Sequence, residues 1–297
     1  MAKRTFHYHA SAHALSGQFW RPFQRVIEVQ APTTLPSIGG VGKSRVDNFR
    51  LDDLVSFKAG YTHVLGSKKE EFDDQGKLKK TLYTTQVTST VEGLNILDVV
   101  TADRVVARLT SSHDLSDGEA HIHLVGSKFE NLRIAGCEVD VKLRHDLLQP
   151  LDGSPPLETF AAVTKEFAKG GEFRKMAEDT LKARLYPEPE VPKDAELPKE
   201  LELHGVLLCS IVKEVEFKYP GAEENQQKKR YPCPGVERCG RHMFRVLDFG
   251  NVFLAEVQFE YGRKSLTMLR LELGSPNGAA MTIVQADSNG RPYPPTG

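Results

Sequence analysis

The chain has 297 residues, of which 39% are hydrophobic and 27% are charged, as in ordinary folded globular proteins. The 39 Lys and Arg residues nearly balance the 40 Asp and Glu residues, and the net charge is −1. A nucleic-acid-binding protein usually carries a basic excess or stripe. Here the dense basic run Lys228-Lys229-Arg230 falls in a polar loop, so we expect no nucleic-acid partner.

The sequence also argues against membrane insertion. No stretch approaches the roughly 18 consecutive apolar residues of a transmembrane helix, and no apolar stretch of a secretory signal follows the charged start. Four cysteines are too few for a disulfide scaffold in a chain of this length. We therefore expect reduced thiols and a cytoplasmic protein.

Alternation of apolar and polar residues with a period of two is the dominant pattern, and it predicts β-strands. The clearest strands are expected at 6–14, 55–62, 119–124, 137–143, 253–261 and 269–273, with others near 23–29, 82–91, 103–111 and 203–219. One apolar and one polar face is typical of antiparallel sheets, and short repeated spacing is typical of sandwiches and barrels. The expected fold class is mainly β, with antiparallel sandwich-like sheets.

Residues 157–185 break this pattern, because their apolar residues follow helical spacing. Gly170-Gly171 divides the segment, which predicts a helical hairpin inserted between strands. A Pro-rich stretch at 187–198 has the composition of a stiff linker. We therefore expect a β-rich domain at 1–150, the hairpin and linker at 151–198, and a second β-rich part at 199–297 packed on the first.

Familiar catalytic motifs are incomplete. Gly39-Gly40-Val41-Gly42-Lys43-Ser44 lacks the first glycine of a phosphate-binding loop, since Ser37 occupies that position. Asp248-Phe249-Gly250 matches the kinase magnesium triplet by letters alone and is better interpreted as a turn that opens a strand. The sequence leaves enzymatic activity undecided and favours a protein without it.

Histidines supply the sharpest chemical signal. His7, His9 and His13 share one face of the first strand, and His121 and His123 share the same face of another. If the two strands are neighbours, His7, His9, His121 and His123 would offer four nitrogen ligands to a metal ion. The alternative, exposed histidines on polar strand faces, stays open, and no other cofactor is indicated.

Cys233, Cys239 and His242 form a second candidate metal site. Their spacing, Cys-x5-Cys-x2-His, departs from that of structural zinc sites, and a fourth ligand would have to come from elsewhere. Whether these residues bind metal is left open.

Lys213 interrupts the apolar positions of the predicted strand at 203–219. A charge at such a position indicates a β-bulge or the edge of a sheet, and an edge strand is a surface on which a partner can dock.

Residues of about 45–145 carry a family resemblance. The unit Gly93-Leu94-Asn95-Ile96-Leu97 leads into a strand, and the unit running from Gly126-Ser127-Lys128-Phe129 through Asn131-Leu132 to Gly136 follows it. Both resemble the β domain of bacterial choice-of-anchor surface proteins. The resemblance implies an antiparallel β fold without established chemistry. Because the sequence shows no signal or anchor segment of the kind found in that family, we do not expect the surface location that the family has.

The sequence therefore leads to two hypotheses. The first is a non-enzymatic structural or binding β protein, a self-associating subunit with a protein partner or a homo-oligomeric state. The second is a metal-binding protein or metal-dependent enzyme that uses the histidine-bearing strands.

Overall fold

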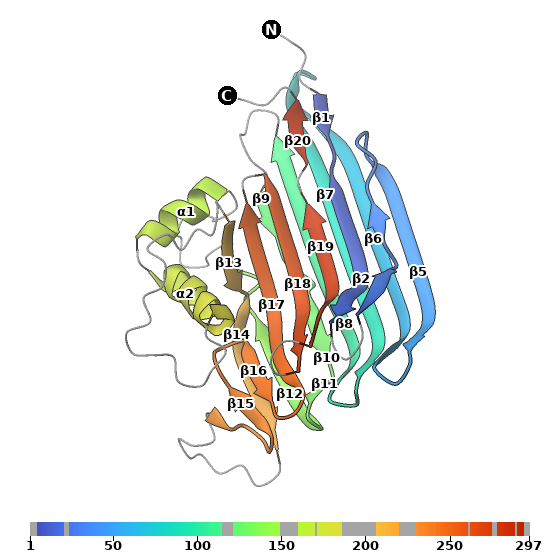
Figure 1. The fold of residues 1–297 in the computed structure, drawn as a ribbon. Coiled ribbons are helices and arrows are strands. Elements are labelled where there is room, and N and C mark those ends of the chain that lie inside the picture. The colour runs from blue at the N-terminus through green and yellow to red at the C-terminus, as the bar shows by residue number, and fades with distance from the viewer. Residues whose placement is uncertain are drawn as a thin grey trace.

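A computed structural model describes residues 5–20, 24–114, 121–148, 160–169, 171–185, 206–219, 230–260, 262–274, 278–288 and 290–293. The fold is mainly β and consists of two nine-stranded antiparallel sheets that face each other (Figure 1). This arrangement confirms the expected sandwich-like class. A short additional pair joins β1 (Thr5–His7) to β20 (Arg291–Tyr293).

The first sheet has the strand order β14-β12-β11-β8-β7-β6-β5, and β9 and β10 also pair with β8. Its strands are β5 (Gly40–Leu51), β6 (Val55–Phe72), β7 (Leu78–Ile96), β8 (Val100–Asp114), β9 (His121–His123), β10 (Lys128–Glu130), β11 (Leu132–Ile134), β12 (Cys137–Leu143) and β14 (Val212–Lys218).

The second sheet has the order β15-β16-β17-β18-β19-β2-β3, with β13 paired to β17 and β4 paired to β2. Its strands are β2 (Ala10–Phe19), β3 (Arg25–Gln30), β4 (Thr33–Thr34), β13 (Val206–Ser210), β15 (Val236–Arg238), β16 (Met243–Val246), β17 (Gly250–Glu260), β18 (Arg263–Leu273) and β19 (Ala279–Ser288).

The core lies between the two sheets, where the apolar side chains at alternate positions of each strand point inward. Val91 and Leu109 from the first sheet, and Leu15 and Ile283 from the second, are fully buried in one hydrophobic cluster. Burial of apolar surface is the main stabilising contribution of such a core, about 25 cal/mol for each Å² removed from water.

The sheets do not follow the expected division of the chain into a first β-rich part at 1–150 and a second at 199–297. β2 and β3 come from the first part of the chain but lie in the sheet built mostly from the second part. β14 comes from the second part but lies in the sheet built from the first. The single hydrophobic cluster contains side chains from both parts. The segment at 151–198 therefore does not separate two independent cores.

The predicted strand at 203–219 is wrong as a single element, because it is split between the sheets. Ile211 stands between β13 and β14, and its N–H donates to the carbonyl of Ala255 in the second sheet at 2.9 Å. Its own carbonyl accepts from the N–H of Arg144, just after β12 of the first sheet, at 2.7 Å. The sequence did not reveal this crossing, because apolar residues stand at alternate positions on both sides of Ile211.

The predicted helical hairpin is present as α1 (Phe160–Ala168) and α2 (Glu172–Leu185). α2 lies against β13, over the second sheet (Figure 1). In the described part of the chain, no helix has both the length and the apolar character needed to cross a membrane. The Pro-rich stretch at 187–198 lies outside the described residues.

The central position of Leu109 yields a test of this core. Leu109→Ala should lower the free energy of unfolding by about 2–5 kcal/mol, since it removes a fully buried side chain from well-packed surroundings. Val125→Ala, at an exposed turn, should change it by less than about 0.5 kcal/mol. Urea unfolding of both variants measures the difference, and equal effects would contradict this placement of the core.

Candidate functional site

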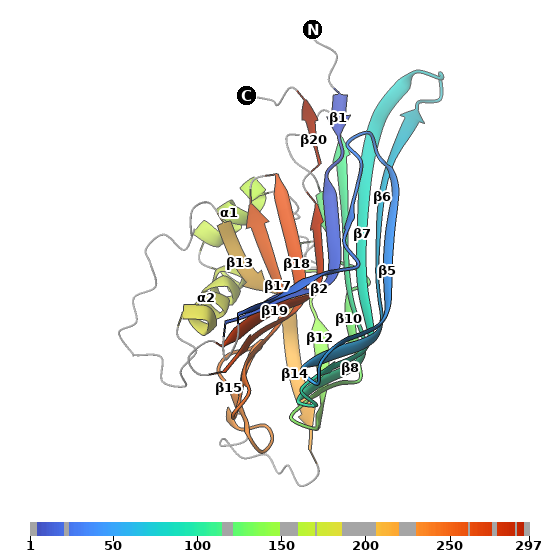
Figure 2. The ribbon, with the colours of Figure 1, turned by 45° about the vertical axis from the view of Figure 1, so that its right-hand side comes forward.

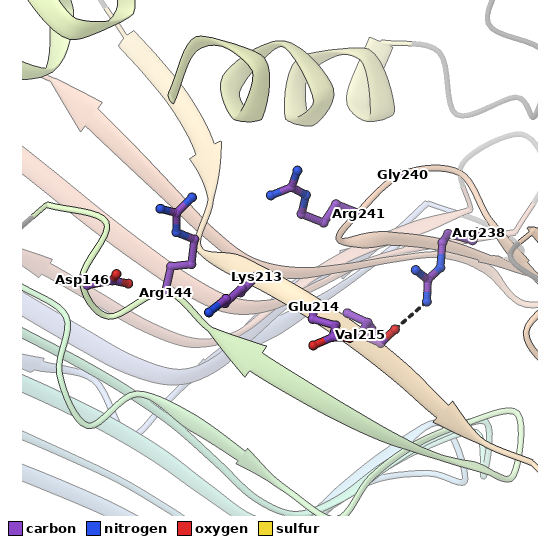
Figure 3. A pocket seen from close by; sticks show the side chains of 8 residues that line it. All are labelled: Arg144, Asp146, Lys213, Glu214, Val215, Arg238, Gly240 and Arg241. Carbon is purple, nitrogen blue, oxygen red and sulfur yellow. Dashed lines mark hydrogen bonds between the residues drawn. The ribbon is translucent and has the colours of Figure 1, made fainter. Parts of the chain in front are cut away.

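A cavity of about 670 Å³ opens on one side of the sandwich, where β14 forms the edge of the first sheet and the β15–β16 hairpin the edge of the second. Figure 3 shows Arg144, Lys213 and Arg241 grouped around this space. The described residues that line the cavity are Arg144, Asp146, Lys213, Glu214, Val215, Arg238, Gly240 and Arg241.

Lys213 reaches the cavity because β14 is bulged. Glu214 pairs with Lys142 and Val212 pairs with Leu143, so Lys213 is skipped in the register with β12. A bulge redirects the side chain of the extra residue. The sequence prediction of a bulge or an edge at Lys213 is confirmed on both counts, since β14 also ends the sheet.

Arg144 and Asp146 follow the end of β12. The backbone N–H of Arg144 is held by Ile211, and its guanidinium Nη1 lies 3.4 Å from Met176 Sδ of α2. The crossing point between the sheets therefore also fixes one wall of the cavity.

Arg238 bridges the two edges. Its Nη2 donates to the carbonyl of Val215 in β14 at 2.7 Å, and its guanidinium carbon lies 5.5 Å from the centre of the Phe244 ring. Burial lowers the pKa of Arg238, although an arginine stays charged at any physiological pH. Its buried Nε has no hydrogen-bond partner among the described residues.

Arg241 is presented by the four-residue loop between β15 and β16. The N–H of Cys239 donates to the carbonyl of Met243 at 3.1 Å and closes this loop. A Cβ added at Gly240 would lie 3.5 Å from Ala183 of α2, so the loop passes close beneath the helix. Arg241 and Lys213 form no ion pair with any described residue.

A buried ionic cluster anchors the same loop from behind. Glu256 of β17 is only 2% exposed and accepts two hydrogen bonds from Arg184 of α2, at 2.9 and 2.7 Å. His242 Nε2, one residue from Arg241, lies 3.5 Å from the same carboxylate. Burial favours a raised pKa for Glu256, but His242 and Arg184 outweigh it and lower the pKa to about 2.

The four predicted histidine ligands belong to two separate segments of the chain. His7 is at the end of β1 and His9 follows it, both exposed, whereas His121 and His123 are half-buried in β9 beside β8. Among the described residues, no group of three or more His, Cys, Asp or Glu side chains is placed to hold a metal ion. The four-histidine hypothesis therefore gains no support from the fold.

His13, on the predicted polar face of the first strand, is engaged within the second sheet. Its Nε2 lies 3.2 Å from the hydroxyl of Thr282 and 3.0 Å from that of Ser16. Burial lowers the pKa of His13, and the nearby Asp287 opposes this effect.

The second metal candidate is also dispersed. Cys233 is buried and forms a β-bridge with Val236, Cys239 Sγ lies 3.9 Å from the carbonyl of Glu237, and His242 faces Glu256. Burial raises the pKa of Cys233 to about 12, and its interaction with Cys137 acts in the same direction.

Comparison with known proteins identifies the family. Residues 6–260 match the family model described as a domain of unknown function, DUF8256. The chain belongs to this family. The match includes every residue that lines the cavity and ends before β18. No curated protein and no solved structure matches the chain.

Sequence reasoning missed Arg144, Arg238 and Arg241. Arg144 lies far from Arg238 and Arg241 in the chain, and all three are in segments where arginine is unremarkable. They meet beside β14 after the chain has crossed between the sheets at Ile211. Lys213 was the one local signal, because it broke the parity of its strand.

The Glu256 cluster can be tested by removing its main cation. Arg184→Met should lower the free energy of unfolding by about 3 kcal/mol, because a buried carboxylate loses its strongest partner. Arg174→Met in the same helix breaks the partly exposed pair with Glu178 and should cost about 1 kcal/mol or less. Chemical unfolding compares the two variants, and similar losses would argue against the cluster as the anchor of α2.

The same carboxylate predicts an acid dependence. The folded pKa of Glu256 is about 2 against an ordinary value of 4.5, so its contribution is present above pH 4.5 and is lost as the pH falls towards 2. The difference in unfolding free energy between the wild type and Glu256→Gln should therefore shrink across this window. Unfolding at a series of pH values checks it, and a difference independent of pH would refute the assignment.

Proposed function

We propose that this protein is a non-enzymatic binding protein whose cavity between β14 and the β15–β16 loop holds an anionic group. One observation carries the proposal: four cationic side chains, Arg144, Lys213, Arg238 and Arg241, line the cavity against two carboxylates. Of those carboxylates, Glu214 is already paired with Lys142 at 2.9 Å.

The cations are placed to receive a ligand. Lys213 and Arg241 lack an ion pair among the described residues, and Arg238 has a buried Nε without a partner. Like charges held together repel each other, and a bound anion relieves this repulsion. Guanidinium groups suit phosphate and carboxylate oxygens in particular, because they can donate two parallel hydrogen bonds.

The lining supports binding rather than chemistry. Among the described residues that face the cavity, none is Ser, Thr, Cys, His or Tyr, so these residues offer no hydroxyl, thiol or imidazole nucleophile. Val215 is the one large apolar residue of the lining. The ligand that fits is a small anion, or the anionic end of a larger molecule.

Three expectations from the sequence remain proposals. They are a protein partner or homo-oligomeric state, a cytoplasmic location, and the resemblance to choice-of-anchor β domains. The four free cysteines, three of them buried, are compatible with a reducing compartment.

Inorganic phosphate and pyrophosphate are suitable probes for the cavity. Either should raise the midpoint of thermal unfolding at constant ionic strength, because a ligand at 100 times its Kd stabilises the folded state by about 2.7 kcal/mol. In Lys213→Gln/Arg241→Gln the affinity for the anion, measured by calorimetry, should fall by at least about tenfold.

Lys69→Gln is the matched control, since Lys69 is an exposed lysine in β6, outside the cavity. It should bind phosphate as the wild type does. Equal binding by the control and by the double variant would show that the anion acts elsewhere, and the proposal would fail.

A further inference from the structure

The opposite side of the sandwich is built differently from the cavity side. There the first sheet ends at β5, a strand of twelve residues whose pairing among the described residues is with β6 alone. Figures 1 and 2 both show β5 at the outer rim of the sheet. No residue of β5 is buried, and Val41 is 55% exposed.

An unpaired edge of this length is a template for another strand, because its outward N–H and C=O groups can extend the ladder. The other described sheet ends are shorter or occupied. β3 has six residues and β15 has three, while β14 already uses the carbonyl of Val215 to accept from Arg238. β5 contains no proline, and although β4 lies against it near Gly42, no described strand other than β6 forms a ladder with it.

We propose that β5 pairs with β5 of a second copy of this chain, antiparallel and centred on Val46. A two-fold axis perpendicular to the sheet is the closed, self-complementary way to join two identical edges. Residues directly opposite each other in an antiparallel pair point to the same face. Under this axis, each residue therefore lies opposite one that is an even number of positions away, and one residue lies on the axis.

Charge selects the register among the central alternatives. Centring on Ser44 sets Lys43 opposite Arg45, and centring on Arg45 or on Asp47 sets that residue opposite itself, so all three place like charges in contact. Centring on Val46 sets Arg45 of each copy opposite Asp47 of the other. Opposite charges directly across a strand pair are favourable and like charges are unfavourable.

Within a single copy, Arg45 and Asp47 are already held in position by contacts with each other and with Tyr61. Arg45 Nε and Nη2 each lie 2.9 Å from Asp47 Oδ1 of the same strand, and the Arg45 guanidinium lies 5.9 Å from the centre of the Tyr61 ring. In the pair of copies, each carboxylate would lie between two guanidinium groups. Little side-chain freedom is lost when the copies meet, because each pair is formed beforehand.

The order of charges on β5 also distinguishes an edge that binds a second copy from an edge that only prevents pairing with other strands. Edge strands often carry lysines that repel other strands. β5 instead carries Arg45 and Asp47 in an order that repels a second copy in neighbouring registers and attracts it in one. Asn48, at a φ of 53°, is a local irregularity within the otherwise continuous pairing of Gly40–Leu51 with β6, so we expect a weak, concentration-dependent dimer.

Sedimentation of the full chain over a concentration series tests the pairing. The wild type should show a monomer–dimer equilibrium. Asp47→Arg should weaken dimerisation by at least about tenfold, because it turns two attractive pairs into repulsive ones. Arg45→Asp/Asp47→Arg recreates the complementary order and should restore most of the affinity. A monomer at every concentration, or an Asp47→Arg variant that dimerises like the wild type, would overturn the proposal.

Cysteine cross-linking tests the register independently. Under mild oxidation Val46→Cys should form a covalent dimer, since directly opposite Cα atoms lie about 4.5–5.5 Å apart, within the reach of a disulfide. Ser44→Cys is the matched control, because in this register its two copies are four positions out of alignment. The wild type controls for the four native cysteines. Cross-linking at 44 rather than 46, or equally at both, would reject the register.

Discussion

Ile211 joins the two sheets through its own backbone. Its N–H completes the hydrogen bonding of β17 at Ala255, and its carbonyl holds the N–H of Arg144 beside β12. The chain thus passes from one sheet to the other within a single residue, which leaves no room for slippage of either β13 or β14. The lateral position of both sheets on this side of the sandwich depends on this crossing.

The cavity is a consequence of that crossing. β14 meets β12 with a bulge at Lys213, and its outer edge takes the hydrogen bond from Arg238 of the facing hairpin. The Glu256 cluster then ties the hairpin loop to α2 through His242 and Arg184. The cationic side chains of Arg144, Lys213, Arg238 and Arg241 are thereby held close together around the cavity. In the unfolded chain the same side chains would be separated by water.

The two sides of the sandwich handle their edges in different ways. On the cavity side, the edge strand β14 of the first sheet accepts a hydrogen bond from Arg238 of the facing hairpin, and charged side chains converge. On the β5 side, no described strand other than β6 pairs with the edge strand, which carries alternating charges at Arg45 and Asp47. Ligand binding and self-association would therefore use surfaces that do not compete.

The sequence by itself determined the fold class, the helical hairpin and the irregularity at Lys213, because period-two alternation and helical spacing report local geometry and the face that each residue buries. It did not determine which strands are neighbours. β2 and β14 lie in different sheets from most of their sequence neighbours, and the segment 203–219 is split at Ile211. Neither feature changes the alternation of apolar and polar residues along a strand, so the sequence pattern could not predict them. For the same reason the sequence could assign the histidines to strand faces but could not decide which strands are neighbours. Contacts between distant strands are decided only when hydrogen bonding and burial are satisfied together in three dimensions.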